Sequence, residues 1–191
     1  MVNSFLEHWP QEITMHLYCE NFETGLDNSR VIEHDIFETC PQLTNYIVQN
    51  NNDHNNGIRN GKRDFKYDAI KFCYKVFAQC HRIKNSSADT LIFIDADTVT
   101  FAKPPVNEIQ ELLPADNFTA YIGRPNNTKL PFAETGYIMY NLKHPDTKDF
   151  ADVFEDLYTS GKIFNLEYQV DCFVYDTARR NIEQKHNAKS N

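Results

Sequence analysis

The stretch that decides the fold is LIFIDADTVTF, residues 91–101, in which an unbroken apolar run ends in two carboxylates one residue apart. Branched and aromatic residues fill positions 91–94, which is typical of a strand buried on both faces in a parallel sheet under helices. Because a buried unpaired carboxylate is costly, Asp95 and Asp97 are expected at the carboxyl end of this strand, facing a cleft. Open α/β sheets bind their ligands at that edge.

The flanking segments predict further strands and helices. Strands are expected at 13–20, 31–38, 119–124 and 135–142, and helices at 4–9, from residue 41, and at 67–83, 107–113 and 149–161. NNNDHNNG (50–57) predicts a mobile loop, and 168–180 fits a helix or a strand, with a helix favoured. This order predicts one α/β domain over residues 1–180, with a mixed, mostly parallel sheet flanked by helices, and a polar tail at 181–191.

Composition limits the partners of the chain. The 191 residues suit one domain, and 27 acidic against 19 basic residues argue against a nucleic-acid partner, because such binding depends on Lys and Arg. An acidic cleft that binds a divalent cation fits better. The five cysteines form no CxxC pair and indicate buried thiols in a reducing compartment, so the cytoplasm is expected. No apolar run approaches the roughly 18 residues of a membrane span.

Asp95 and Asp97 offer oxygen ligands at a spacing that suits a hard metal ion. From a continuing strand, side chains two residues apart point to the same face. Two carboxylates placed in this way match Mg²⁺ or Mn²⁺, which can also bind a diphosphate. Short Asp-x-Asp matches are common, and the alternative is a solvated turn after the strand. The buried strand before the pair favours the metal site.

Three stretches together resemble the GT-A glycosyltransferases, which have a Rossmann-like fold. They are KYDAIKFCYKVFAQ (66–79), LIFIDADTVTF (91–101) and ETGYIMYNLKH (134–144). The resemblance covers residues 10–178 and is nearest to small phage and bacterial proteins, with a more distant similarity to glycosyltransferase family 8. It implies that Asp97 and Asp95 bind the metal of a nucleotide-sugar diphosphate, with contact to the ribose as the other possible role of Asp95.

The resemblance also implies further site residues. In the family, a C-terminal H-x-x-G-x-x-K segment completes the metal site; here His186 and Lys189 stand in H-N-A-K, which lacks the glycine. Glu134, Thr135 and Gly136 open a strand with a carboxylate, a hydroxyl and a glycine, which suits hydrogen bonding to a sugar at close approach. Asp171 interrupts a mostly apolar stretch and is expected to support the reacting centre or position the acceptor.

Positions near the nucleotide are predicted from their place in the chain. Tyr18 and Glu20, at the end of the first strand, occupy the region that meets the base in GT-A proteins. Lys71 or Arg63 could meet the nucleotide. Asp68, Lys71 and Lys75 lie at helical spacings, so a charged outer helix face with pairs between them is an equal alternative.

The sequence thus predicts a metal-dependent glycosyltransferase that moves a hexose, from UDP-glucose or UDP-galactose by preference, to an unknown sugar acceptor. Retention of configuration is favoured by the similarity to family 8. One alternative is a haloacid-dehalogenase-type phosphatase with Asp95 as nucleophile and Asp97 as general acid/base. About half the chain precedes the motif and no later acidic pair completes that site, which argues against it. The other alternative is a non-catalytic nucleotide-sugar-binding module, which turnover with acceptors would distinguish.

Overall fold

The computed structural model of the chain describes residues 1–124, 126, 131–186 and 189–190. The helices are α1 (Val2–His8), α2 (Ile36–Thr39), α3 (Pro41–Asn50), α4 (Ala69–Asn85), α5 (Val106–Glu111), α6 (Pro145–Thr159), the 3₁₀ helix η1 (Lys162–Asn165) and α7 (Asp171–His186). The strands are β1 (Met15–Cys19), β2 (Val31–Asp35), β3 (Asn56–Arg59), β4 (Lys62–Asp68), β5 (Thr90–Ile94), β6 (Asn117–Ile122), β7 (Glu134–Asn141) and β8 (Lys189–Ser190).

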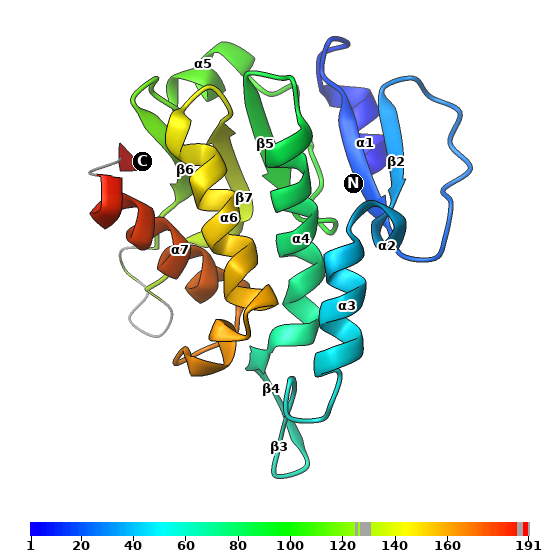
Figure 1. Cartoon of the computed structure of the whole chain (residues 1–191). Helices are drawn as coiled ribbons and strands as arrows, with labels where there is room; N and C mark the ends of the chain where they lie inside the picture. Colours follow the sequence, from blue (N-terminus) through cyan, green and yellow to red (C-terminus); the bar gives the residue numbers. More distant parts are fainter. Residues whose placement is uncertain (125, 127–130, 187–188, 191) are drawn as a thin grey trace.

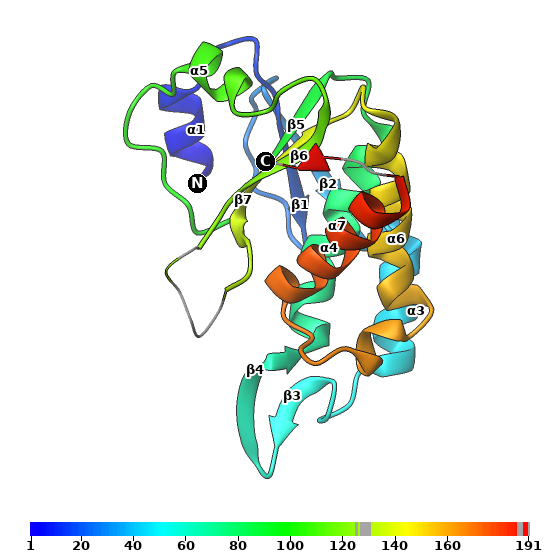
Figure 2. The same cartoon turned by 90° about the vertical axis from the view of Figure 1, so that its left-hand side faces the viewer.

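The elements form layers around a central sheet. The helices α4, α6 and α7 lie side by side on one face of the sheet (Figure 1), and α1 and α5 lie on the other face (Figure 2). Buried aromatic side chains fill the space between the sheet and the three long helices, among them Tyr140, Phe150, Phe154, Tyr158 and Tyr175. The predicted helix at 168–180 is confirmed as α7, which continues past residue 180 to His186.

The central sheet differs from the expected arrangement. Its strand order is β5-β7-β6-β8, with β7 antiparallel to both neighbours and β8 parallel to β6, while β1 and β2 form a separate parallel pair. The prediction of a mostly parallel sheet is therefore wrong, although the sheet is mixed. Only residues 123–133 separate β6 from β7, whereas a parallel return needs a crossover of a dozen or more residues. As an edge strand of this sheet, β5 has half-buried residues, whereas full burial was predicted.

A hairpin that the sequence did not predict projects from the lower end of the molecule in both views (Figures 1 and 2). It consists of β3 and β4, where a loop and the start of a helix were expected. Asn60 and Gly61 join the strands, and both have positive φ (52° and 71°), as two-residue hairpin turns require. The strands were missed because their residues are mainly charged and lack a clear apolar alternation.

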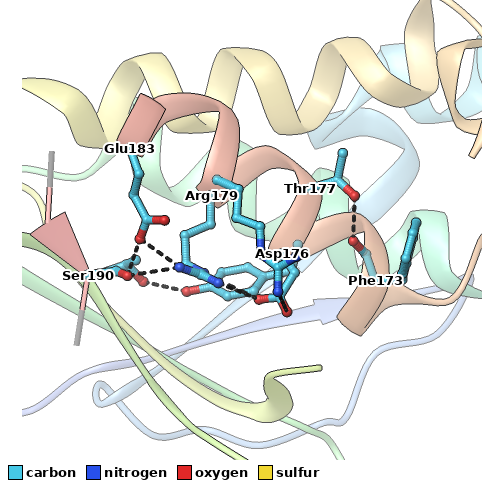
Figure 3. Close-up of polar contacts among 9 residues, drawn as sticks. Phe173, Asp176, Thr177, Arg179, Glu183 and Ser190 are labelled. Carbon is cyan, nitrogen blue, oxygen red and sulfur yellow. Dashed lines mark hydrogen bonds and ion pairs between the residues drawn. The ribbon is translucent and has the colours of Figure 1, made fainter. Parts of the chain in front are cut away.

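A buried ion-pair network fixes the C-terminal half of α7 (Figure 3). The guanidinium of Arg179 lies 3.2 Å from Asp176 and 2.6 Å from Glu183, and it donates a hydrogen bond of 3.1 Å to Ser190 of β8. The same guanidinium stacks over the ring of Tyr121 on β6 at 4.8 Å. One cation thus joins α7 to two strands of the sheet, and the side chains of Arg179 and Asp176 are only 9% and 6% exposed.

All five cysteines are free and buried, as predicted from their apolar surroundings. Burial raises the pKa of the thiols of Cys40 and Cys172 to about 11 and raises the pKa of Cys80 well above its ordinary value. In the described part of the chain, no helix is both long enough and apolar enough to cross a bilayer.

Candidate active site

Asp95 and Asp97 lie directly after β5, at the edge of the sheet where the sequence places them. The Asp95 backbone N–H donates to the carbonyl of Gly136 at 3.0 Å, and the Asp95 carbonyl accepts from the Thr98 N–H at 3.0 Å. The chain therefore turns at Asp95, and the expectation of a continuing strand with both side chains on one face is wrong. Asp95 is half-buried, whereas Asp97 is exposed on the turn.

Lys75 joins two carboxylates that are far apart in the sequence. Its Nζ lies 2.7 Å from Asp95 Oδ1 and 2.6 Å from Asp171 Oδ2. The Lys75 side chain comes from the middle of α4, is 14% exposed, and lies over the ring of Phe93 at 5.1 Å. Two carboxylates share one ammonium, so the centre keeps a negative charge that can attract a second cation.

Thr135 and the start of α7 fix Asp171. The Thr135 hydroxyl donates to Asp171 Oδ2 at 2.6 Å, and Lys75 Nζ lies 3.4 Å from the same hydroxyl oxygen. Asp171 is the first residue of α7, where the helix dipole favours a negative charge. Asp171 is therefore a buried carboxylate with its orientation set by three elements, as the interruption of its apolar stretch predicted.

Glu134 and Gly136 form the wall of the centre next to Asp95. The Gly136 N–H donates to Glu134 Oε1 at 3.1 Å, while Glu134 Oε2 pairs with Arg124. A Cβ at position 136 would lie 3.2 Å from Asp95 Oδ2 and 3.3 Å from Glu134 Oε1, closer than ordinary contact. Glycine at this position lets two carboxylates approach the same strand.

The residues of this centre fit a divalent cation that is shared with a diphosphate. Within the described ranges, no group of three or more His, Cys, Asp or Glu side chains could hold a metal by itself. Such a group is not needed, because Mg²⁺ is often held by one or two carboxylates together with substrate phosphates. Asp95 Oδ1 holds Lys75, so Asp95 Oδ2 and the exposed Asp97 are the oxygens that would bind Mn²⁺ or Mg²⁺.

Arg63, Asp68 and Lys71 form a separate group at the base of the hairpin. Asp68 is fully buried, accepts from the Lys71 N–H at 3.0 Å at the start of α4, and pairs with the Arg63 guanidinium. The Lys71 ammonium lies over the ring of Phe72 at 5.4 Å. Asp68 thus caps the start of α4, and its pair with Arg63 holds the hairpin against that helix.

Tyr18 belongs to a cluster of rings between the β1–β2 pair and α4. Its hydroxyl lies 2.7 Å from His81 Nδ1, and His16 Nδ1 lies 2.9 Å from His34 Nε2. The rings of His16, His34 and Tyr18 are stacked. Burial, together with the nearby charge of Arg82, lowers the pKa of His16 to about 4 and also lowers the pKa of His34 and His81.

The three remaining predicted residues lie in other surroundings. Glu20 accepts a hydrogen bond of 3.1 Å from the hydroxyl of Tyr74 on α4. The Nδ1 atom of His186 lies 3.4 Å from Asp146 Oδ1, and its Nε2 atom lies 3.3 Å from Asp149 Oδ2. Lys189 pairs with Asp116. His186 and Asp171 lie at opposite ends of α7, about 22 Å apart for a helix of this length. The structure thus does not bring His186 or Lys189 to Asp95.

Lys75 and Arg124 are the site residues that the sequence reasoning missed. For Lys75 the sequence offered only the charged outer helix face, as an equal alternative to a nucleotide contact at Lys71 or Arg63. The spacing held a signal, because Lys75 and Gln79 share one face of α4, but the burial of Gln79 is visible only in the structure. For Arg124 the sequence held no comparable signal, because its pairing with Glu134 depends on the antiparallel return of β7.

Comparisons with known proteins agree with the arrangement of the elements. No family model matches the chain, and no curated protein matches its sequence. Among solved structures, the chain is similar to the crystal structure of mouse xyloside xylosyltransferase 1 in its apo form, with a TM-score of 0.56 and 14% identity over 100% of this chain and 76% of that one. The chain therefore shares the fold of a glycosyltransferase.

Proposed function

We propose that the chain is a glycosyltransferase that transfers a hexose from a nucleotide-sugar donor to a hydroxyl group of an acceptor. A UDP-sugar, UDP-glucose or UDP-galactose, is the favoured donor. The observation that carries this proposal is the convergence of Asp95, Glu134, Thr135 and Asp171 around Lys75 at the ends of β5 and β7 and the start of α7. The similarity in fold to a xylosyltransferase supports the same assignment.

Each residue has a defined task in this proposal. Asp97 and the free oxygen of Asp95 hold Mn²⁺ or Mg²⁺, which when bound neutralises the charge on the departing diphosphate. The strand start at Glu134 and Gly136 orients the donor sugar, because the missing side chain at Gly136 keeps the carboxylates of Asp95 and Glu134 together at this strand. Asp171 faces the reacting carbon and stabilises the positive charge that develops there.

Lys75 positions this machinery. Its ammonium holds Asp95, on the metal side, at a fixed distance from Asp171, on the sugar side. Holding the leaving group and the reacting carbon in a set geometry is a large part of catalysis of group transfer. Retention of configuration at the transferred sugar is part of the proposal, and NMR of the product anomer would test it.

The first test is calorimetric titration of UDP, UDP-glucose and UDP-galactose into the chain with Mn²⁺ and again with EDTA. Binding that requires the metal is expected, and Asp97→Ala should abolish it while the unfolding midpoint stays unchanged, because Asp97 is exposed. Asp149→Ala, another surface carboxylate change, is the matched control. Unchanged UDP affinity in Asp97→Ala would contradict the assignment and would direct attention to phosphatase assays.

Turnover separates a transferase from a module that only binds the donor. Slow hydrolysis of the donor is compatible with both, so a sugar-acceptor screen is the deciding assay. With a productive acceptor, Asp171→Asn should lower kcat by about 100-fold or more, since it removes a charge that acts in the transition state. Failure of every acceptor alongside tight metal-dependent UDP binding would favour the binding module.

A further inference from the structure

Four aromatic side chains lie together beside the candidate active centre. This aromatic patch consists of Tyr67 on β4, Phe132 before β7, Tyr168 before α7, and Phe173 on α7. The ring centroids are 6.1 Å apart for Tyr67 and Tyr168, 5.4 Å for Tyr168 and Phe173, and 5.0 Å for Phe132 and Phe173. All four side chains are partly exposed, in contrast to the fully buried rings of the core. The patch therefore has a surface that solvent or a ligand can reach.

The aromatic patch is tied to the catalytic centre by the chain itself. Phe132 precedes Glu134 by two residues, and Tyr168 and Phe173 stand three residues before and two residues after Asp171. The backbone N–H of Gln169 donates to the carbonyl of Lys66 at 2.7 Å, which fixes the hairpin to the segment before α7. The aromatic patch therefore flanks the chain segments that carry Glu134 and Asp171.

The projecting hairpin adds positive charge to this surface. Residues 58–68 contain four basic side chains, at 59, 62, 63 and 66, against two acidic ones, in a chain whose net charge is −8. The guanidinium of Arg59 lies over Tyr67 at 4.8 Å, and the Lys66 ammonium lies over Tyr168 at 5.2 Å. Arg63 is neutralised by Asp68, so Arg59, Lys62 and Lys66 supply the positive charge, which Asp64 and Glu167, two carboxylates near Tyr168, offset in part.

We infer that the aromatic patch and the hairpin cations bind the acceptor, and that the acceptor is a saccharide that carries an acidic substituent. This inference rests on the proposed glycosyltransferase function. The C–H face of a pyranose is apolar and packs on the face of an aromatic ring, and partly exposed rings leave room for that contact. An adjoining carboxylate, sulfate or phosphate would then face Arg59 and Lys66, which attract anions. A neutral saccharide would offer no anion to Arg59 and Lys66.

The test measures saccharide binding to the full chain by calorimetry, with a disaccharide that contains glucuronic acid and its neutral glucose counterpart. We expect the acidic sugar to bind at least 10-fold more tightly at low salt, with the difference shrinking in 0.5 M salt because free ions screen the attraction. Equal affinity for the two sugars at low salt would overturn the assignment of an acidic acceptor.

Variants test where the saccharide binds. Tyr168→Ala and Lys66→Gln should each weaken binding of the acidic sugar by about 10-fold, because each removes one half of the proposed contact. The matched controls are Phe22→Ala, another exposed ring, and Lys143→Gln, another exposed ammonium; both should leave the affinity unchanged. Affinities in Tyr168→Ala and Lys66→Gln equal to those in the controls would overturn the location.

A parallel titration of UDP with Mn²⁺ distinguishes this inference from the proposed function. Metal-dependent UDP binding in Tyr168→Ala, together with weaker saccharide binding, supports the acceptor site. If the unaltered chain binds no nucleotide, the proposed function fails, while the comparison of Tyr168→Ala with Phe22→Ala still decides whether saccharides bind at the aromatic patch.

Discussion

Arg179 and Lys75 each hold two carboxylates, and the two surroundings differ in their exposure to solvent. Arg179 lies among Asp176, Glu183 and Ser190 and is covered by the ring of Tyr121, so Asp176 is almost fully removed from solvent and Glu183 is only 25% exposed. Lys75 also holds two carboxylates, but Asp95 is 36% exposed and the exposed Asp97 follows it. A closed network stabilises the fold, whereas an open one keeps carboxylate oxygens free for a ligand.

Breaking the closed network should have the largest effect on stability. Arg179→Met leaves Asp176 buried without its main partner, which costs about 3–5 kcal/mol of the free energy of unfolding. Urea denaturation measures this loss. Lys185→Met is the matched control, since that side chain is exposed on the same helix and its loss should cost less than about 0.5 kcal/mol.

The UDP affinity of Arg179→Met tests whether the closed and the open network are independent. Arg179 lies about two turns along α7 from Asp171, so the fraction of Arg179→Met that remains folded should bind UDP with unchanged affinity. A loss of UDP affinity in protein that is still folded would mean that the two networks are coupled, and the distinction between a structural and a functional cation would fail.

Breaking the open network around Lys75 should lower stability less, and activity more, than breaking the closed network around Arg179. Lys75→Met removes the ammonium between Asp95 and Asp171, and solvent around Asp95 limits the loss to roughly 2 kcal/mol. Transfer should nevertheless fall at least 100-fold, because the two carboxylates then repel each other and lose their geometry. Lys148→Met, an exposed lysine on α6, is the control and should change neither quantity.

A double variant separates charge from geometry at the open network. Lys75→Met combined with Asp171→Asn removes the like-charge repulsion, so the free energy of unfolding should recover most of the loss seen in Lys75→Met. Activity should not recover, since both groups act on the reaction. Recovery of activity would show that Lys75 only compensates the charge of Asp171.

The ring cluster at β1, β2 and α4 is a third polar group, and it contains no carboxylate. Its effect on the free energy of unfolding should be the smallest of the three. The pKa of His16 is lowered to about 4, and the pKa values of His34 and His81 are lowered too, so protons bind the unfolded chain more readily. The stability from this cluster is therefore complete above about pH 6.5 and declines as the pH falls towards 4.

Urea midpoints between pH 7.5 and pH 5 measure this decline. His16→Gln should flatten it, because glutamine takes up no proton, whereas His54→Gln, on the loop before β3, serves as control. An unchanged slope in His16→Gln would remove the cluster from the account of pH dependence.

Sequence reasoning located the open network better than the closed one. Asp95, Glu134, Thr135, Gly136 and Asp171 were each conspicuous as polar or small residues that follow, open or interrupt an apolar stretch, and the structure brings them together. Asp176 and Arg179 lie at ordinary helical spacing, so nothing in the sequence separated them from surface charges. Burial of an ion pair is a property of tertiary packing and is not visible in spacing.

The errors in fold prediction have a similar origin. Apolar patterns identified β5, β7, α4, α6 and α7, because these elements face the core. The hairpin β3–β4 was missed because it projects from the core and its residues are mainly charged. Strand direction was misjudged because the period of a strand carries no information about whether its neighbour runs parallel or antiparallel.

The five buried thiols can report local unfolding in different parts of the molecule. Cys73 and Cys80 lie on α4, the helix that carries Lys75, Cys172 follows Asp171, and Cys19 and Cys40 belong to the N-terminal part of the chain. A thiol that is buried and protonated reacts with an alkylating reagent only when its segment unfolds. Mass spectrometry of the labelled positions would thus give the opening rate of each part separately, and would show whether binding of a ligand at the centre slows the opening of α4 and α7 before that of the strands at the N-terminus.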